Sequence, residues 1–291
     1  MNSVLLAIVG GLPLGATYAL IALGMVLIYR TTGAFNLAHG QFMLLAAFLL
    51  ADWELHRTGP FLLGLAVSIG AAGVVAALLY LVILSRTVGQ PHWVAFVATL
   101  VLGVGLDAFL SLIFKSPTYT IAIPGMPRGA FGLLGVRVGW ASAIVGLVGL
   151  VLSALFIVVL RYTRLGVQVR AAGQDPVLAS QGGIQVRRVY VGAWIAGGAL
   201  AAVAGVLYGS SAVVDSSMSG MALVAVPAMV LGGLDSFEGA IAGGLAIGVV
   251  QGFITVYLGG QYVNVVTYTI LLVLLLALPQ GIFGTKEVLK V

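Results

Sequence analysis

Long apolar runs recur along the whole chain, and short polar stretches separate them. The runs at about 8–30, 60–84, 93–114, 138–160, 189–210, 238–258 and 262–283 are each about as long as the roughly 20 helical residues that cross a hydrocarbon core. Two further runs, at about 38–52 and 217–233, are short for a full crossing. The pattern predicts an all-α fold, a polytopic membrane bundle of eight or nine spans with one or two broken or re-entrant helices. We expect residues 1–291 to form a single transmembrane domain.

One polar segment, at about 161–188, interrupts this pattern more than any other. It holds Arg161, Arg164, Arg170, Asp175, Arg187 and Arg188, so it cannot face lipid. Asp175-Pro176 is an N-cap followed by a proline at the first helical position, and Gly182-Gly183 is a typical helix stop. These signals predict a helix of little more than one turn at 176–181, after another short helix near 165–172. A helix this short does not persist alone in water. It therefore packs either on its own membrane domain or in the groove of a partner.

Composition agrees with a membrane protein, because 61% of the residues are hydrophobic and 7% are charged, with a mean hydropathy of +1.18. If the 161–188 loop is cytoplasmic, nine of the 13 Lys and Arg residues lie inside, as the positive-inside rule requires. The inside set is Arg30, Arg86, Arg161, Arg164, Arg170, Arg187, Arg188, Lys286 and Lys290, and the outside set is Arg57, Lys115, Arg128 and Arg137. We therefore expect a multi-pass membrane protein with a cytoplasmic C-terminus. The basic residues orient helices, so nucleic-acid binding is not expected.

The outer loop at 115–137 carries Pro117, Pro124 and Pro127 together with four glycines. Proline fixes φ and removes a backbone donor, so we expect a structured, non-helical cap. It serves either as a surface for an external partner or as a connector.

Several kinds of site are missing from the chain. It has no cysteine and its three histidines, His39, His56 and His92, are far apart, so no metal site is expected. It has no phosphate-binding loop, no His-Glu-x-x-His and no Gly-x-Ser-x-Gly motif. We expect neither a catalytic residue nor a bound nucleotide, and an enzyme is not predicted.

Polar residues within or beside the apolar runs are the candidates for a translocation pathway. Residues 33–41 include Asn36, His39 and Gln41, and polar backbone at membrane depth occurs only where it is buried or lines a cavity. The other interpretation, which residue propensity favours, is a plain cytoplasmic loop without a role in the pathway. Asp107 lies in the middle of an apolar run, where an ionisable group faces protein or water. It has either a functional role or a structural one, as the partner of another polar group.

Near the C-terminal third, Asp235 and Glu238 have the spacing of a capping box, which we prefer to a proton relay. The glycines that follow repeat at a spacing of four, as in close helix–helix contacts, within one protomer or across a dimer. They are Gly239, Gly243, Gly244, Gly248 and Gly252, and Gly11 and Gly15 repeat the pattern in the first run.

Five segments together resemble a known family. They are LGATYALIALG at 14–24, YRTTGAFNLAHGQ at 29–41, RLGVQVRAA at 164–172, LGGLDSFEGAIAGG at 231–244 and LPQGIFG at 278–284. In this order they resemble the LivH-type permease of branched-chain amino acid ABC importers, nearly from end to end. Two positions differ from the family pattern: Leu37 replaces a phenylalanine, and Gln41 replaces a common glutamate, which removes a charge.

The resemblance implies an inner-membrane permease subunit that pairs with a second, similar permease, two cytoplasmic ATPase subunits and an external solute-binding protein. This chain would hold no cofactor, and the ATPase subunits would bind ATP and Mg²⁺. The coupling element would comprise Arg170, Asp175, Pro176, Gly182 and Gly183. Related permeases carry urea or short amides, so these substrates stay as an alternative. A self-sufficient secondary transporter or channel and a structural membrane scaffold are the other hypotheses.

Overall fold

The computed structural model of the chain describes residues 2–56, 59–87, 90–115, 118–127, 129–133, 135–278 and 280–284. Pro117 and four of the basic residues used above to orient the chain, Arg57, Arg128, Lys286 and Lys290, lie outside these ranges. So does the C-terminal end, whose side of the membrane therefore stays a prediction.

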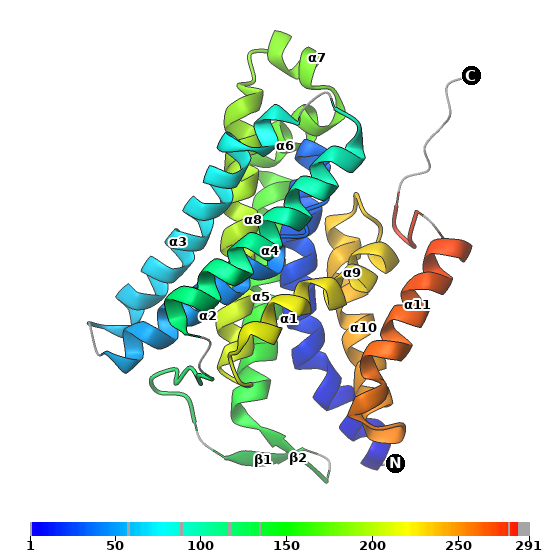
Figure 1. The fold of residues 1–291 in the computed structure, drawn as a ribbon. Helices are drawn as coiled ribbons and strands as arrows, with labels where there is room; N and C mark the ends of the chain where they lie inside the picture. The colour runs from blue at the N-terminus through cyan, green and yellow to red at the C-terminus, as the bar shows by residue number, and fades with distance from the viewer. Residues whose placement is uncertain are drawn as a thin grey trace.

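The described chain is a helical bundle with one small β-hairpin (Figure 1). Its elements are α1 (Asn2–Thr32), α2 (His39–Leu55), α3 (Phe61–Val82), the 3₁₀ turn η1 (Leu84–Arg86), α4 (His92–Phe114), β1 (Ala130–Leu133), β2 (Val136–Gly139), α5 (Trp140–Tyr162), α6 (Arg164–Gln174), α7 (Pro176–Gln181), α8 (Val186–Gly209), η2 (Ser216–Gly220), α9 (Met221–Gly232), α10 (Phe237–Tyr257), η3 (Gly260–Tyr262) and α11 (Val263–Ala277).

Seven helical segments of the described chain are long and apolar enough to cross a membrane. Two others are shorter: α2 has 17 residues, and η2 with α9 covers Ser216–Gly232. The predicted polytopic bundle is confirmed, and the two short runs are the two short helices. Two boundaries were wrong. Helix α1 begins at Asn2 instead of about 8. The last helix ends at Ala277 instead of about 283, because the backbone amides of Ile282 and Phe283 pair with carbonyls at the end of α9.

Helix α1 is the centre of the bundle. It packs against α5, α8, α9 and α10, and its side chains from Ala16 to Ile28 are almost all fully buried. Figure 1 shows α6 and α7 at one end of the bundle and the hairpin at the opposite end, where α1 also begins. These opposite ends agree with the predicted placement of the 161–188 and 115–137 loops on opposite sides of the membrane.

The predicted cap at 115–137 is non-helical wherever the structure describes it. Strands β1 and β2 pair antiparallel, with Leu133 opposite Val136. Tyr119 forms an isolated bridge with Val214 in the loop after α8, which attaches the segment to the bundle.

The predicted capping box at the start of α10 was wrong. The N-cap is Ser236, whose hydroxyl accepts a hydrogen bond from the Gly239 amide at 3.0 Å. Since the helix begins one residue later than the motif suggested, Asp235 is outside the cap. Asp235 and Glu238 instead attract Arg30 at the end of α1, whose guanidinium also lies 5.1 Å from the centre of the Phe237 ring.

Candidate functional site

The polar break between α1 and α2 lies inside the bundle. Gly33 turns the chain with a φ of 66°, and Asn36 and His39 are 2% and 0% exposed. A Cβ on Gly24 would approach the His39 ring to 2.8 Å. Gly24 is eight residues before the end of α1, which corresponds to a rise of about 12 Å along the helix. The segment after α1 therefore folds back about 12 Å into the bundle. The alternative of a solvent-exposed loop is therefore wrong.

Helix α4 presents a polar face to this break. The Thr99 hydroxyl accepts a hydrogen bond from the Leu37 amide at 3.2 Å and lies 3.0 Å from the carbonyl oxygen of Phe35, to which it can donate. One turn further along, a Cβ on Gly103 would lie 3.3 Å from Gln41 Oε1. The break and the start of α2 are thus held against α4.

The same face of α4 continues with Asp107 and Ser111, since residues four apart stack on one side of a helix. The Ser111 hydroxyl oxygen lies 3.4 Å from that of Ser216 in η2. Close contact also joins η2 to α2, where the backbone of Ser219 packs directly on Gly40. Two short helices, α2 and η2–α9, therefore meet beside α4 within the bundle.

Five buried polar atoms in this region have no hydrogen-bond partner among the described residues. Three of them, Asn36 Nδ2, Gln41 Oε1 and Asp107 Oδ1, belong to the break and to α4, and the other two are the ring nitrogens of His39. Buried polar atoms are normally paired, and each unpaired one costs about 1–3 kcal/mol. We call Asn36, Gln41, Thr99, Asp107 and Ser111 the central polar cluster. Its free donors and acceptors can bind water or a passing polar solute.

His39 is placed differently from the other predicted pathway residues. It precedes Gln41 by two residues, which puts it on the opposite side of α2. Its ring lies against Gly24 in α1, packs edge-on to Phe42, and has no hydrogen-bond partner for either nitrogen among the described residues. The structure brings Gln41 toward α4, which carries Asp107, and leaves His39 packed against Gly24 of α1.

The 161–188 loop folds as the motifs predicted. Helix α6 spans Arg164–Gln174 and α7 spans Pro176–Gln181. One carboxylate oxygen of Asp175 accepts hydrogen bonds from the Val177 and Leu178 amides, each at 2.9 Å. Gly183 ends the turn with a φ of 84°. A carboxylate that caps two amides fixes this short helix at the tip of the bundle (Figure 1).

Two apolar side chains on α7 were missed by the sequence analysis. Val177 and Leu178 are each 63% exposed on a loop outside the membrane spans. Two apolar residues within the polar 161–188 segment were the signal that the sequence offered. Exposed together beside the cap, they form an apolar tip that the described chain leaves mostly uncovered.

Arg170, the other residue predicted for coupling, faces inward. Its Nη1 donates to the carbonyl oxygen of Leu160 at 2.8 Å, and Gly166 packs directly on the same carbonyl. This contact holds α6 against the end of α5 and so positions α7.

The glycines of α10 contact two neighbours instead of lying along one face. Gly239 and Gly243 pack on the backbone of α9, whereas Gly244 and Gly248 pack on α1. A Cβ on Gly244 would approach the Ala19 amide nitrogen to 2.5 Å. These contacts lie within the chain and hold α10 between α1 and α9.

The fold and site define a polytopic helical membrane protein of the transporter class, with a polar cluster inside the bundle and a structured loop at one end. Within the described residues, no group of three or more His, Cys, Asp or Glu side chains could hold a metal ion.

The chain belongs to the family described as branched-chain amino acid transport system / permease component, which matches residues 7–277. It is 33% identical to the high-affinity branched-chain amino acid transport system permease protein LivH of Escherichia coli (strain K12), over 97% of this chain and 96% of that protein. It is 31% identical to the permease protein BraD of Pseudomonas aeruginosa, over 98% of this chain and 97% of that protein. The family is one of transport components, so the chain is a permease and not an enzyme.

A solved structure has a similar fold. PsaBC from Streptococcus pneumoniae in complex with Fab superposes with a TM-score of 0.50, at 15% sequence identity, over 91% of this chain and 90% of that one. At this identity the likeness concerns the fold alone.

Proposed function

We propose that this chain is the permease subunit of an ATP-driven importer of branched-chain amino acids in the inner membrane. The observation that carries the proposal is the set of three unpaired polar atoms, Asn36 Nδ2, Gln41 Oε1 and Asp107 Oδ1, buried within the bundle. Buried polar atoms are normally paired, and three unpaired ones on side chains that converge beside α4 are what a pathway needs to bind a polar solute.

The cluster has groups for both charges of an amino acid. Helix α2 begins inside the bundle, and within the described part of the chain no side chain caps its N-terminus at Ala38. The free amides and positive dipole end of such a discontinuous helix favour a carboxylate. The Asp107 carboxylate and the Gln41 carbonyl oxygen can accept hydrogen bonds from an ammonium group. Urea and short amides carry neither charge, so this arrangement favours amino acids over them.

The energy for transport would come from partner subunits through α7. The apolar tip, Val177 and Leu178, would dock into a groove of a cytoplasmic ATPase subunit, which binds ATP and Mg²⁺. Asp175, Pro176, Gly182 and Gly183 shape the helix that docks, and Arg170 transmits its movement to α5. The α7 end would then be cytoplasmic and the hairpin end external, where a solute-binding protein delivers the substrate.

The complete importer would contain this chain, a second similar permease, two ATPase subunits and the solute-binding protein. Co-purification with mass identification of the bound chains tests this composition. Reconstitution in proteoliposomes then tests the activity: the complex should take up leucine with internal ATP, whereas the chain alone should not. Gradient-driven uptake by the chain alone would favour a secondary transporter, and uptake of urea in preference to leucine would overturn the substrate assignment.

A variant tests coupling in the same assay. Gly183→Arg places a large side chain at a φ of 84°, a conformation that favours glycine. It should leave the subunit in the membrane and abolish stimulation of ATP hydrolysis by the loaded binding protein. Stimulation at the wild-type level would contradict the docking role of α7.

A further inference from the structure

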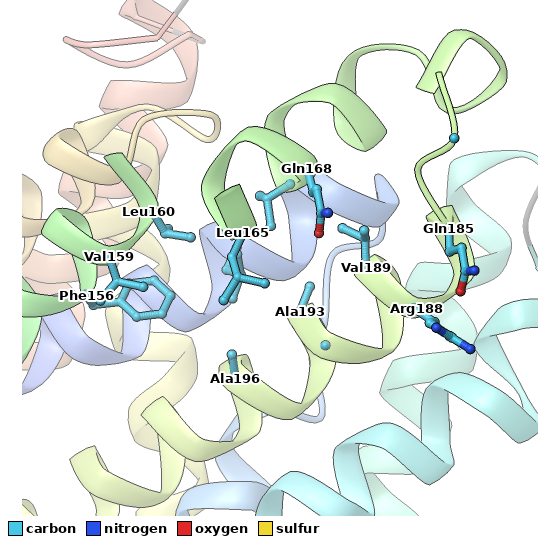
Figure 2. A pocket seen from close by; sticks show the side chains of 14 residues that line it. Phe156, Val159, Leu160, Leu165, Gln168, Gln185, Arg188, Val189, Ala193 and Ala196 are labelled. Atoms are coloured by element: carbon cyan, nitrogen blue, oxygen red, sulfur yellow. The ribbon is translucent and has the colours of Figure 1, made fainter. Parts of the chain in front are cut away.

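A groove runs between α5 and α8 on the side of α1 (Figure 2). Both helices pack on α1, but they contact each other little. The space between them forms a cavity of about 570 Å³. Its apolar lining includes Leu27, Phe156, Val159, Val189, Ala193 and Ala196.

The groove continues deeper into the membrane span. A second cavity of about 320 Å³ shares Phe156, Val159 and Ala196 with the first one. It extends to Leu152, Leu200 and Val203, and all its lining side chains are apolar. From Arg188 to Val203 the rise along α8 is about 22 Å.

The end of the groove nearest α7 is polar. Figure 2 shows Gln168, Gln185 and Arg188 there, whereas Phe156 and Ala196 lie toward the other end. Arg188 and Gln185 are exposed. Arg188 therefore adds a positive charge where the groove leaves the membrane span.

We propose that this groove binds one anionic phospholipid of the leaflet on the α7 side. The phosphate would lie at Arg188, with Gln168 and Gln185 as further donors, and one acyl chain would lie between α5 and α8. One leaflet contributes about 15 Å of hydrocarbon, so a groove of about 22 Å accommodates one chain and the start of its headgroup. Basic pockets between helices on the cytoplasmic side are typical sites for anionic headgroups.

The position of this site links lipid to the coupling segment. Leu165 in α6 and Gly183 after α7 also line the groove. A lipid bound there would contact α5, α6 and α8 at once, and so would hold the 161–188 loop in place. The central polar cluster contributes no residue to this groove, so the lipid site is separate from the proposed pathway.

Native mass spectrometry of the full chain tests the proposal. The purified protein is titrated with phosphatidylglycerol or phosphatidylcholine, and the retained lipid is counted. Wild-type protein should retain phosphatidylglycerol preferentially. Arg188→Gln should reduce this preference by about fivefold, the effect of one basic residue at an anionic surface, and its exposed position leaves the fold intact. Ala196→Phe should fill the groove and reduce retention of both lipids.

Two matched controls fix the location. Arg187→Gln removes a neighbouring charge that does not line the groove, and Ala154→Phe adds the same bulk on the exposed face of α5. Both should behave as wild type. Equal retention of the two lipids by wild-type protein would overturn the proposal, as would controls that lose lipid like the groove variants. An Ala196→Cys variant that cross-links to the second permease of the assembled complex would also overturn it, because a protein would then fill the groove.

Discussion

The apolar tip of α7 offers a quantitative test of the coupling role. Val177 and Leu178 are each 63% exposed, so a partner groove could still bury about two-thirds of each side chain. Complete burial of such a side chain contributes roughly 1.5–3 kcal/mol. The two together should therefore contribute about 2–4 kcal/mol to docking.

The Val177→Ala/Leu178→Ala double variant removes most of this contribution. Alanine is the best helix former, and the Asp175 cap uses only backbone amides, so α7 should keep its shape. A loss of about 2 kcal/mol corresponds to roughly 30-fold weaker binding. We expect the affinity of the ATPase subunit for the permease in detergent to fall by at least that factor.

Val213→Ala is the matched control, because Val213 is 50% exposed in the loop after α8, toward the opposite end of the bundle. It should leave the affinity unchanged. An unchanged affinity in the double variant, with the ATPase still bound, would refute the docking of this tip.

Three other predictions, two of them with a control variant, test separate parts of the account. Asp175→Ala should destabilise α7 by about 1 kcal/mol and reduce coupled ATP hydrolysis, which an ATPase assay measures. Asp175→Asn should keep both the stability of α7 and the coupled hydrolysis. Asp107→Asn should raise the KM for leucine uptake by about tenfold, as expected for loss of one charged hydrogen bond, with normal amounts of protein in the membrane; an unchanged KM would remove Asp107 from the pathway. Gly248→Val should lower the melting temperature of the purified subunit, because its Cβ would overlap the α1 backbone at Gly15, whereas Gly70→Val, with open space at its Cβ, should not.

Local signals in the sequence predicted local structure well. The Asp-Pro start and Gly-Gly stop defined α7 to the residue, because a cap and a stop act within one turn. Run length separated the two short helices from the long ones. At Asp235 and Ser236 the same kind of reasoning failed, since two neighbouring residues can each cap and the tertiary position of the helix start decides between them.

The candidate site was only partly predictable. The polar residues at 33–41 identified the break, but not that it folds back beside Gly24, which depends on packing between α1 and α8. The opposite orientations of His39 and Gln41 follow from the residue at which α2 begins. The spacing of four between residues on the Thr99–Ser111 face of α4 was visible in the sequence. The segments that this face contacts were not, because long-range contacts leave no local pattern. The groove between α5 and α8 was not predictable, because it depends on the distance between these two helices where they pack on α1.

The central claim is that α7 lies in the cytoplasm and contacts an ATPase subunit. The chain has no cysteine, so Val177→Cys gives a single reactive thiol at the tip. In the assembled complex we expect a membrane-impermeant thiol reagent to label it only in inside-out vesicles, and a short bifunctional reagent to cross-link it to the ATPase. Labelling in intact cells, or no cross-link to a co-purified ATPase, would contradict the account.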